Sequence, residues 1–242
     1  MSVQPIILAA GKGTRMNNPD LPKPLVLLKG RPMVSYVLDT VEKAEFLPAA
    51  LVVGYLKEKV SQTLGDGYTY VAQDEQLGTG HAVAVCEEQL AGTADCFLIV
   101  CGDMPLLKPE TLKKVVEVHD ESRAVLSLAT LRTDRPDFNS FGRIIRDTEG
   151  NIKAIREYKD ATEEERAINE YNPGIYCFSD SWVWDALRKV DRVNAQGEYY
   201  LTDLLAIAVA EGEKIASVEM TSWQETLGIN SPEQLEEAAK WV

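Results

Sequence analysis

The sequence has 242 residues, and its 38 Asp and Glu residues outnumber 25 Lys and Arg residues, which gives a formal net charge of −13. A hydrophobic share of 45% is enough to bury a core, so the composition excludes a disordered chain and fits one α/β domain spanning residues 1–242. The acidic balance, without a basic cluster, excludes nucleic acid and anionic membranes as partners.

Short apolar runs alternate with segments of helical periodicity over the first half of the chain. This alternation predicts right-handed crossovers and a doubly wound, mainly parallel, Rossmann-like α/β sheet, whose ligands bind beyond the carboxyl ends of its strands. The predicted strands are 5–10, 49–55, 68–73, 96–103 and 124–131, and the predicted helices are 32–44, 57–64, 79–91 and 109–122.

The pattern changes in the second half, where residues 141–157 alternate around the turn "TEGN" and predict an inserted β-hairpin. The acidic residues 160–168 predict a solvated helix or loop. Ser231, Pro232 and Gln234 have the spacing of a capping box that starts a last helix. The remaining predicted elements are strands at 174–179 and 214–220 and helices at 181–190 and 198–212.

Four cysteines, Cys86, Cys96, Cys101 and Cys177, lack the C-x-x-C spacing of zinc or redox sites. We therefore expect reduced thiols that pack as small hydrophobic side chains in a cytoplasmic protein. The apolar residues 6–10 follow no basic region and are too short for a signal sequence. No stretch approaches the roughly 18 apolar residues of a membrane-spanning helix.

A glycine-rich turn, "GKGTR" (residues 11–15), follows the first predicted strand, where backbone N–H groups can approach a phosphate chain. A dinucleotide-binding G-x-G-x-x-G motif is excluded, because Met16 stands where its third glycine would lie. A Walker A loop is excluded as well, since no Gly-Lys-Ser/Thr closes the turn.

The turn and the segment after it supply three cations, Lys12, Arg15 and Lys23. Pro22 and Pro24 restrict the backbone on both sides of Lys23, which lowers the entropic cost of presenting its ammonium to a polyanion. The alternative is a Gly/Pro surface loop whose cations are solvated.

Asp103 follows the apolar residues 96–101 and is therefore predicted at the carboxyl end of a central strand. A carboxylate beside phosphates implies a divalent cation. Mg²⁺ fits best, because it takes one or two protein oxygens and completes its shell with phosphate and water. The alternative is a turn aspartate before Met104 and Pro105.

A series of motifs between residues 6 and 231 resembles the uridyltransferase domain of the bacterial GlmU family, the bifunctional N-acetylglucosamine-1-phosphate uridyltransferases/glucosamine-1-phosphate acetyltransferases. The first turn, the lysine and the aspartate are common to sugar nucleotidyltransferases, whereas "EQLGTGHA", "EYKDAT" and "NAQGEYYLTD" are specific to this family. In chain order the motifs are "LAAGKGTRM", "DLPKPL", "QDEQLGTGHA", "GDMPLL", "FGRIIRD", "EYKDATEEE", "YNPGIY", "NAQGEYYLTDLLAIA" and "LGIN".

The resemblance implies a nucleotidyltransferase-type fold with a nucleotide-binding half at 1–132, a sugar-binding half at 133–221 that places the hairpin over the sugar site, and a metal-ligand loop with a C-terminal helix at 222–242. It implies transfer of UMP from UTP to N-acetylglucosamine 1-phosphate by in-line attack, with Mg²⁺ as cofactor. The implied residues are Arg15, Lys23 and Asp103 for catalysis; Leu8, Ala9, Ala10, Gly11, Gly13, Gln73, Gly78, Thr79, Cys101 and Gly102 for the nucleotide; Gly142, Glu157 and Asn172 for the sugar; and Asp103 and Asn230 for the metal.

The residues themselves support three of these placements. Gln73 offers a donor and an acceptor, which match the imide edge of uracil. Thr79 opens a predicted helix, where its hydroxyl either binds a base carbonyl or only caps the helix. Glu157 ends the predicted hairpin, where it either accepts hydrogen bonds from sugar hydroxyls or is an ordinary surface acid.

Two departures from the family pattern leave other functions open. Pro173 stands where the family usually has Thr, and it removes a backbone donor beside the sugar. The family continues into hexapeptide repeats that carry acetyl transfer and form trimers, and this sequence has none, so we expect no acetyltransferase activity and no oligomeric state is implied. The alternatives are transfer to another sugar 1-phosphate, glucose or galactosamine 1-phosphate, with UTP or dTTP; a non-catalytic sugar-nucleotide sensor; and a structural α/β protein.

Overall fold

One mixed sheet forms the centre of the molecule. The computed structural model describes residues 1–16, 20–135, 138 and 140–242, and over these residues the sheet has ten strands in the order β5–β4–β1–β6–β11–β7–β10–β8–β9, with β12 paired to β7. The strands are β1 (Val3–Ala9), β4 (Ala50–Val53), β5 (Thr69–Ala72), β6 (Cys96–Cys101), β7 (Leu126–Arg132), β8 (Gly142–Arg146), β9 (Ile152–Arg156), β10 (Glu170–Asn172), β11 (Tyr176–Ser179) and β12 (Ile215–Met220), and a separate small hairpin consists of β2 (Leu27–Leu28) and β3 (Arg31–Pro32).

The strand directions confirm the predicted fold class. β5, β4, β1 and β6 run parallel. β11 then enters antiparallel between β6 and β7, while β12 lies parallel to β7. β10 connects β7 to the antiparallel pair β8–β9, which is the predicted hairpin. The result is an α/β fold with a parallel core, extended by antiparallel strands.

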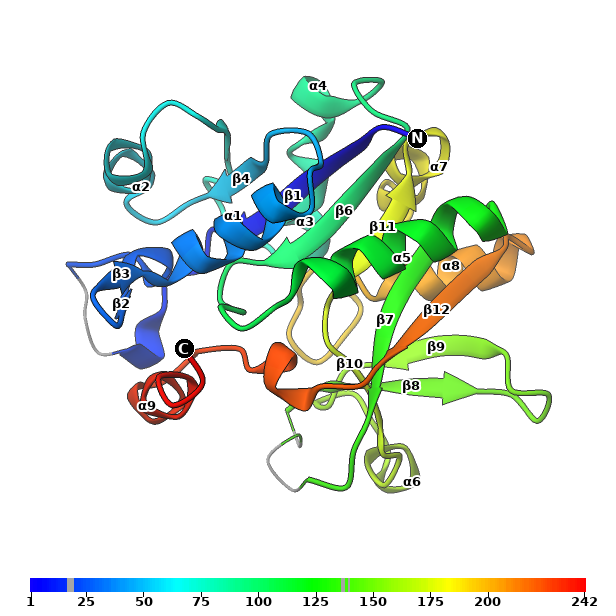
Figure 1. Ribbon diagram of the computed structural model, residues 1–242. Coiled ribbons are helices and arrows are strands. Elements are labelled where there is room, and N and C mark those ends of the chain that lie inside the picture. The colour runs from blue at the N-terminus through cyan, green and yellow to red at the C-terminus, as the bar shows by residue number, and fades with distance from the viewer. Residues whose placement is uncertain (17–19, 136–137, 139) are drawn as a thin grey trace.

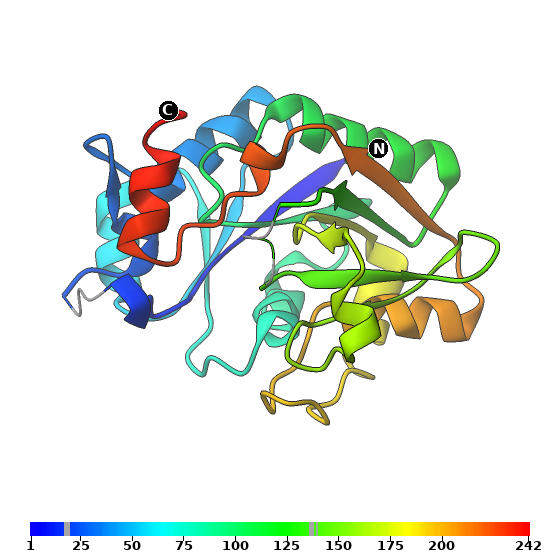
Figure 2. The ribbon, with the colours of Figure 1, turned by 90° about the horizontal axis from the view of Figure 1, so that it is seen from below.

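Helices cover both faces of this sheet (Figures 1 and 2). The helices α1 (Met33–Lys43) and α5 (Pro109–Ser122) pack on one face. The helices α3 (Thr79–Ala84), α7 (Asp180–Leu187) and α8 (Asp203–Glu211) pack on the other. The remaining helices of the described residues are α2 (Lys57–Leu64), α4 (Glu87–Leu90), α6 (Glu163–Arg166) and α9 (Pro232–Ala238), together with the 3₁₀ turns η1 (Thr14–Met16), η2 (Lys23–Leu25) and η4 (Trp223–Thr226).

The apolar spacing of each helix explains how it packs. In α5 the buried residues are Leu112, Val115 and His119, which are three or four positions apart and so form one stripe facing the sheet. This spacing places a histidine in the core. Among the helices of the described residues, none combines the length and apolar character that crossing a bilayer needs.

Two predicted helices differ from the structure. The helix expected at 79–91 is interrupted at residues 85–86, so that α3 and α4 are separate. The helix expected at 198–212 begins only at Asp203. Its first turn is missing because the backbone of Tyr199 bonds elsewhere: its N–H donates to Leu77 O at 2.8 Å, and its carbonyl accepts from Gly80 N at 2.8 Å.

Candidate active site

The carboxyl ends of β1 and β6 lie side by side and begin the site. Leu8 is in register with Cys101, and Gly102 N donates to Leu8 O at 3.0 Å. The glycine-rich turn leaves β1 at this point. Gly13 has φ +66°, and a Cβ added to it would lie 2.7 Å from the Lys23 Cβ. The turn therefore packs directly on Lys23, and both its conformation and this contact require glycine at position 13.

Four polar side chains from distant parts of the sequence meet in front of this edge. The Lys23 ammonium donates to a carboxylate oxygen of Asp103 and, at 2.7 Å, to Asn230 Oδ1. Arg15 Nη2 donates to the same Asn230 oxygen at 2.9 Å. We call these four residues the Lys23 cluster. Sequence reasoning expected all of them at one edge of the sheet, and the structure brings them into direct contact.

The segment before α9 fixes the orientation of Asn230. Its backbone N–H donates to Gln234 Oε1 at 2.7 Å, and its side-chain Nδ2 donates to Gly228 O at 3.3 Å. The predicted capping box is half right: Ser231 Oγ accepts from Gln234 N, but the Gln234 side chain reaches Asn230 instead of Ser231. Gln234 therefore helps to hold the backbone of Asn230. The side-chain oxygen of Asn230, Oδ1, faces Lys23.

The donor chemistry of the cluster fits a hard divalent cation. Asp103 supplies a carboxylate and Asn230 an amide carbonyl, and both oxygens are bound by the same ammonium. Mg²⁺ prefers such oxygens and takes few of them from protein. Ile229 N donates to Asp103 O at 2.9 Å, which ties the two ligand-bearing segments together through their backbones.

A cavity of about 250 Å³ opens at the ends of β1 and β6. Residues expected at the nucleotide and the phosphates line it, namely Leu8, Ala9, Ala10, Gly11, Lys23, Gln73, Gly78, Thr79, Cys101, Gly102 and Asp103. Pro24, which braces Lys23, also lines it, as do four residues to which the sequence assigns no role, namely Met33, Gln76, Ala82 and Glu198.

A second cavity, of about 820 Å³, adjoins the first. Cys101 and Asp103 line both cavities, so the two meet at the Lys23 cluster. The expected residues Arg15, Glu157 and Asn230 also line the second one. Burial raises the pKa of the Cys101 thiol to about 12, so this shared wall carries a neutral thiol.

Two residues expected at the base have protein partners. Gln73 Nε2 donates to Gly78 O at 3.0 Å and lies 3.1 Å from His81 Nδ1. Thr79 is the first residue of α3, and its hydroxyl accepts from Leu201 N at 3.1 Å without capping the helix. The capping alternative for Thr79 is therefore wrong, and its hydroxyl joins α3 to the start of the α8 segment.

The residues expected at the sugar lie around the end of the hairpin. Glu157 is partly buried, and burial raises the pKa of its carboxyl, while a hydrogen bond from Thr202 Oγ1 at 3.1 Å opposes the shift. A Cβ added to Gly142 would lie 3.6 Å from Glu157 Oε1. Asn172 Nδ2 donates to the Tyr176 hydroxyl at 2.6 Å, and Asn172 Oδ1 accepts from Gly174 N. Of the three residues expected at the sugar, Glu157 lines the second cavity, whereas Gly142 and Asn172 lie behind its lining residues.

A model of the MobA-like NTP transferase domain matches residues 5–205. The chain belongs to this family of NTP transferases.

Within the NTP transferases, the chain is similar to GlmU proteins. The chain is 43% identical to the bifunctional protein GlmU of Exiguobacterium sp. over 233 residues, which are 96% of this chain and 51% of that protein. It is 42% identical to GlmU of Geotalea daltonii over 242 residues, 99% of this chain and 52% of that protein. The resemblance drawn from the motifs is confirmed, and the chain spans about half the length of these relatives.

Two solved structures share the fold. A putative glucose-1-phosphate thymidylyltransferase from Bacillus anthracis superposes with a TM-score of 0.82 at 21% identity, over 99% of this chain and 95% of that one. A UDP-glucose pyrophosphorylase complexed with UDP-glucose gives 0.79 at 19% identity, over 100% and 98%. These identities establish the NTP transferase fold alone.

Two motifs that seemed specific from sequence lie against each other in this NTP transferase. Gly78 has φ +119°, and a Cβ added there would lie 2.5 Å from Tyr199 O. "EQLGTGHA" and "NAQGEYYLTD" therefore form one wall, and from it Gln76 and Glu198 face the first cavity while Gln196 faces the second. Sequence reasoning had quoted these residues within the motifs without giving them a role.

The second cavity also contains residues that sequence reasoning missed. Phe138 and Phe141 stack with ring centroids 4.9 Å apart, and Tyr158 lies beside Glu157. Glu233 and Glu237 reach the cavity from α9, which had been predicted only as a terminal helix. This placement could not be predicted from sequence, because the position of α9 depends on long-range packing.

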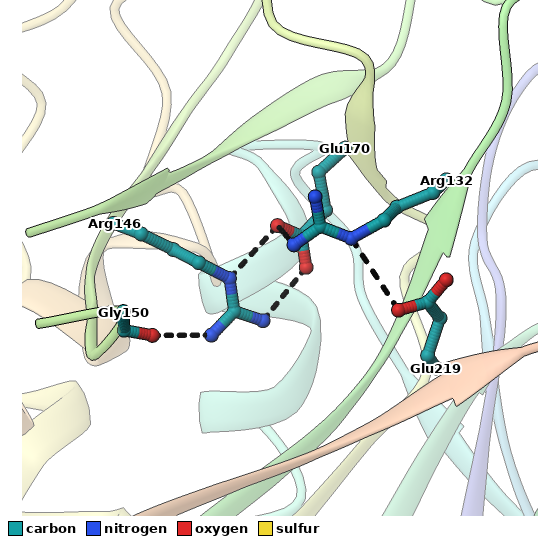
Figure 3. A network of polar contacts seen from close by, with 5 residues as sticks. All are labelled: Arg132, Arg146, Gly150, Glu170 and Glu219. Carbon is teal, nitrogen blue, oxygen red and sulfur yellow. Dashed lines mark hydrogen bonds and ion pairs between the residues drawn. The ribbon is translucent and has the colours of Figure 1, made fainter.

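An ionic network around the buried Glu170 joins four strands of the sheet (Figure 3). Glu170, in β10, is 2% exposed and accepts from Arg146 Nε at 2.8 Å, Arg146 Nη2 at 2.7 Å and Arg132 Nη2 at 2.7 Å. Arg132 also pairs with Glu219 at 3.3 Å, and Arg146 Nη1 donates to Gly150 O. We call Arg132, Arg146, Glu170 and Glu219 the Glu170 cluster; it joins β7, β8, β10 and β12.

Two of the buried cysteines, Cys96 and Cys177, form a cluster with His119 that the sequence did not predict. All four thiols are free, and the possible ligand atoms of Cys96, His119 and Cys177 lie within 4.8 Å of one another. His119 is satisfied by serines, with Ser127 Oγ 3.0 Å from Nδ1 and Ser179 Oγ 3.1 Å from Nε2. The expectation of reduced, buried cysteines agrees with this packing; Cys101 differs because it lines the cavities.

Proposed function

We propose that this chain transfers the uridylyl group of UTP to N-acetylglucosamine 1-phosphate, forming UDP-N-acetylglucosamine and pyrophosphate. One observation carries the proposal: the Lys23 cluster lies where two cavities of different lining meet, with the nucleotide-side residues in one and Glu157 in the other. A reaction between two anions needs positive charge at such a junction. The base and the sugar of this proposal are those that the motif resemblance implies, and the similarity to GlmU proteins supports that choice.

The attacking group needs no protein base. A phosphate monoester has a second pKa near 6, so the sugar phosphate is largely a dianion at neutral pH. Catalysis then consists of positioning and charge neutralisation. Lys23 holds the attacking phosphate and the α-phosphate together, and Arg15 with the N–H groups of the glycine-rich turn holds the leaving pyrophosphate.

Nucleotidyl transfer typically depends on a divalent metal, and Asp103 with Asn230 would hold Mg²⁺ here. When bound, the ion supplies charge stabilisation for the phosphates and the leaving group. Gln73, Gly78 and Thr79 orient the base, while Gly142, Glu157 and Asn172 shape the sugar side. Burial raises the pKa of the Glu157 carboxyl, and its oxygens can accept hydrogen bonds from sugar hydroxyls.

A substrate panel tests the proposal. UTP, dTTP, ATP and GTP are each combined with N-acetylglucosamine, glucose and galactosamine 1-phosphates, and released pyrophosphate is measured. We expect the largest kcat/KM for UTP with N-acetylglucosamine 1-phosphate. Absence of turnover with every pair, while nucleotides still bind, would favour the sensor alternative.

Transfer to a different sugar 1-phosphate is the second candidate. Pro173 lines the second cavity, and proline has no backbone N–H to donate to a sugar substituent. A larger kcat/KM with glucose 1-phosphate in the same panel would select it.

A further inference from the structure

The amide oxygen of Asn230 is saturated by the chain's own cations. It accepts from Lys23 Nζ at 2.7 Å and from Arg15 Nη2 at 2.9 Å. A carbonyl oxygen has two lone pairs, so both acceptor positions are in use. A metal ion that binds this oxygen has to displace at least one of the two cations.

The carboxylate of Asp103 is under the same constraint. The Lys23 ammonium that bonds Asn230 also bonds Asp103 Oδ2, so it lies between the two oxygens expected to hold a metal. A magnesium ion binds such oxygens at about 2.0–2.1 Å. An ammonium and a divalent ion between the same two oxygens would overlap and repel each other, so the two bind in alternation.

Asn230 cannot relieve this conflict by turning its amide. Nδ2 is bonded to Gly228 O, and the backbone N–H is held by Gln234. Lys23 is the mobile partner, because its ammonium is carried on a flexible four-carbon stem, whereas its backbone is braced between Pro22 and Pro24.

The two cations have one natural alternative partner, the phosphates of a bound nucleotide. Lys23 lines the first cavity and Arg15 the second, so a triphosphate extending across the junction reaches both. Phosphate oxygens form short charge-assisted hydrogen bonds with ammonium and guanidinium groups. Hydrogen bonds to a bound triphosphate can therefore replace the ones that Lys23 and Arg15 lose when they leave Asn230 and Asp103.

We propose that Asp103 and Asn230 form a conditional metal site: Lys23 and Arg15 occupy its oxygens in the free chain, and the nucleoside triphosphate frees them, so that the chain takes up the metal–nucleotide chelate instead of binding metal beforehand. The inference rests on the proposed function only in that the ligand is a nucleoside triphosphate. It does not depend on the base or on the sugar acceptor.

Direct metal binding tests the first half. Mn²⁺, an oxygen-seeking probe for a Mg²⁺ site, is titrated into nucleotide-free protein, and unbound Mn²⁺ is measured by electron paramagnetic resonance. Lys23→Met removes the competing ammonium and is expected to bind Mn²⁺ at least about tenfold more tightly than wild type. Lys12→Met, which removes an exposed cation of the same turn, is the matched charge control and stays within about twofold.

The double variant Lys23→Met/Asp103→Asn tests whether the added Mn²⁺ affinity comes from Asp103. It should bind Mn²⁺ no more tightly than wild type. Equal Mn²⁺ affinity in Lys23→Met and Lys12→Met would overturn the proposal, as would a gain that survives in the double variant. These comparisons need neither nucleotide nor turnover, so they can succeed even if the proposed reaction fails.

Water-proton relaxation tests the second half. Mn²⁺ with wild-type protein should give little enhancement, and adding α,β-methylene-UTP should raise it strongly in wild type but not in Asp103→Asn. The same enhancement with and without the analogue would show that metal loads first, contrary to the proposal. If the analogue does not bind at all, the proposed function fails instead, which a separate nucleotide-binding measurement detects.

Discussion

The Lys23 cluster and the Glu170 cluster contain the same chemistry in different surroundings. Each joins carboxylate and cationic side chains from distant segments of the chain. Lys23 and Asp103 border two cavities and keep 14% and 20% of their side chains exposed. Glu170 keeps 3%, and both of its oxygens are engaged by arginines.

This difference distinguishes a cluster that can bind a ligand from one that only stabilises the fold. In the Glu170 cluster the charges neutralise one another inside the sheet, so nothing is left to bind a ligand. The Lys23 cluster contains two cations and a single carboxylate and borders open volume, so an anion can still be attracted. Residue types alone would not distinguish the two clusters; access to a cavity and unbalanced charge do. The following predictions test that contrast in order of decreasing effect.

The largest effect is expected on catalysis. Asp103→Ala and Lys23→Ala should each lower kcat by about 10³-fold, equivalent to about 4 kcal/mol, because each removes charge stabilisation from the reacting phosphates. The thermal midpoint should change little, since both side chains border cavities. Pyrophosphate release and circular dichroism measure the two quantities, and near-normal release in both variants would refute these roles.

The opposite result is expected at Glu170. Glu170→Ala leaves two guanidinium groups without their buried carboxylate and should cost about 3 kcal/mol of unfolding free energy. This is the lower end of the usual range, because Arg132 and Arg146 are partly exposed and can be hydrated. Urea unfolding measures the loss. An unchanged free energy of unfolding would contradict a structural role for the cluster.

The pH dependence of stability should report the buried histidine. Burial lowers the pKa of His119 to about 4, below its usual 6.5, so the unfolded chain binds a proton that the folded chain does not. The free energy of unfolding is therefore highest above pH 6.5, where His119 is neutral in both states. It falls as the pH decreases from 6.5 toward 4. Between pH 7 and pH 5 the loss should be about 1–2 kcal/mol. His119→Gln should show a smaller pH slope in urea unfolding, and an equal slope would argue against this assignment.

The smallest effect is expected at the exposed end of the Glu170 cluster. Glu219 is 56% exposed and pairs with an arginine that is 47% exposed. Glu219→Gln should change the free energy of unfolding by at most about 0.5 kcal/mol, because solvent screens such pairs. It is also the control for Glu170→Ala, and a loss as large as that of Glu170→Ala would mean that burial does not set the cost.

Much of the site could be predicted from the sequence where function depends on local geometry. Neighbouring residues alone predict the glycine-rich turn, Lys23 between two prolines and Asp103 at a strand end. Because parallel strands end at the same edge of a sheet, these features are also expected to lie close together. Their contact with Asn230 came from the family resemblance, because nothing local connects a residue near the C-terminus with the first turn.

What the sequence did not reveal depends on long-range contacts. The first turn of the predicted helix at 198–212 is lost because Tyr199 pairs with Leu77 and Gly80, which periodicity cannot indicate. The Glu170 cluster also escaped notice, since β10 is only three residues long and its partners come from three other strands. The entry of β11 between β6 and β7 was equally hidden, because a strand pattern carries no direction.

That last strand has a consequence for how such a protein can diversify. β11 comes from the second half of the chain yet separates β6 from β7, both of which belong to the first half. A fragment ending at residue 132 would lack the strand that fills the middle of its sheet and would expose two long unpaired edges. The two halves are interlocked by β11, so recombination cannot exchange one half for another as an independent module.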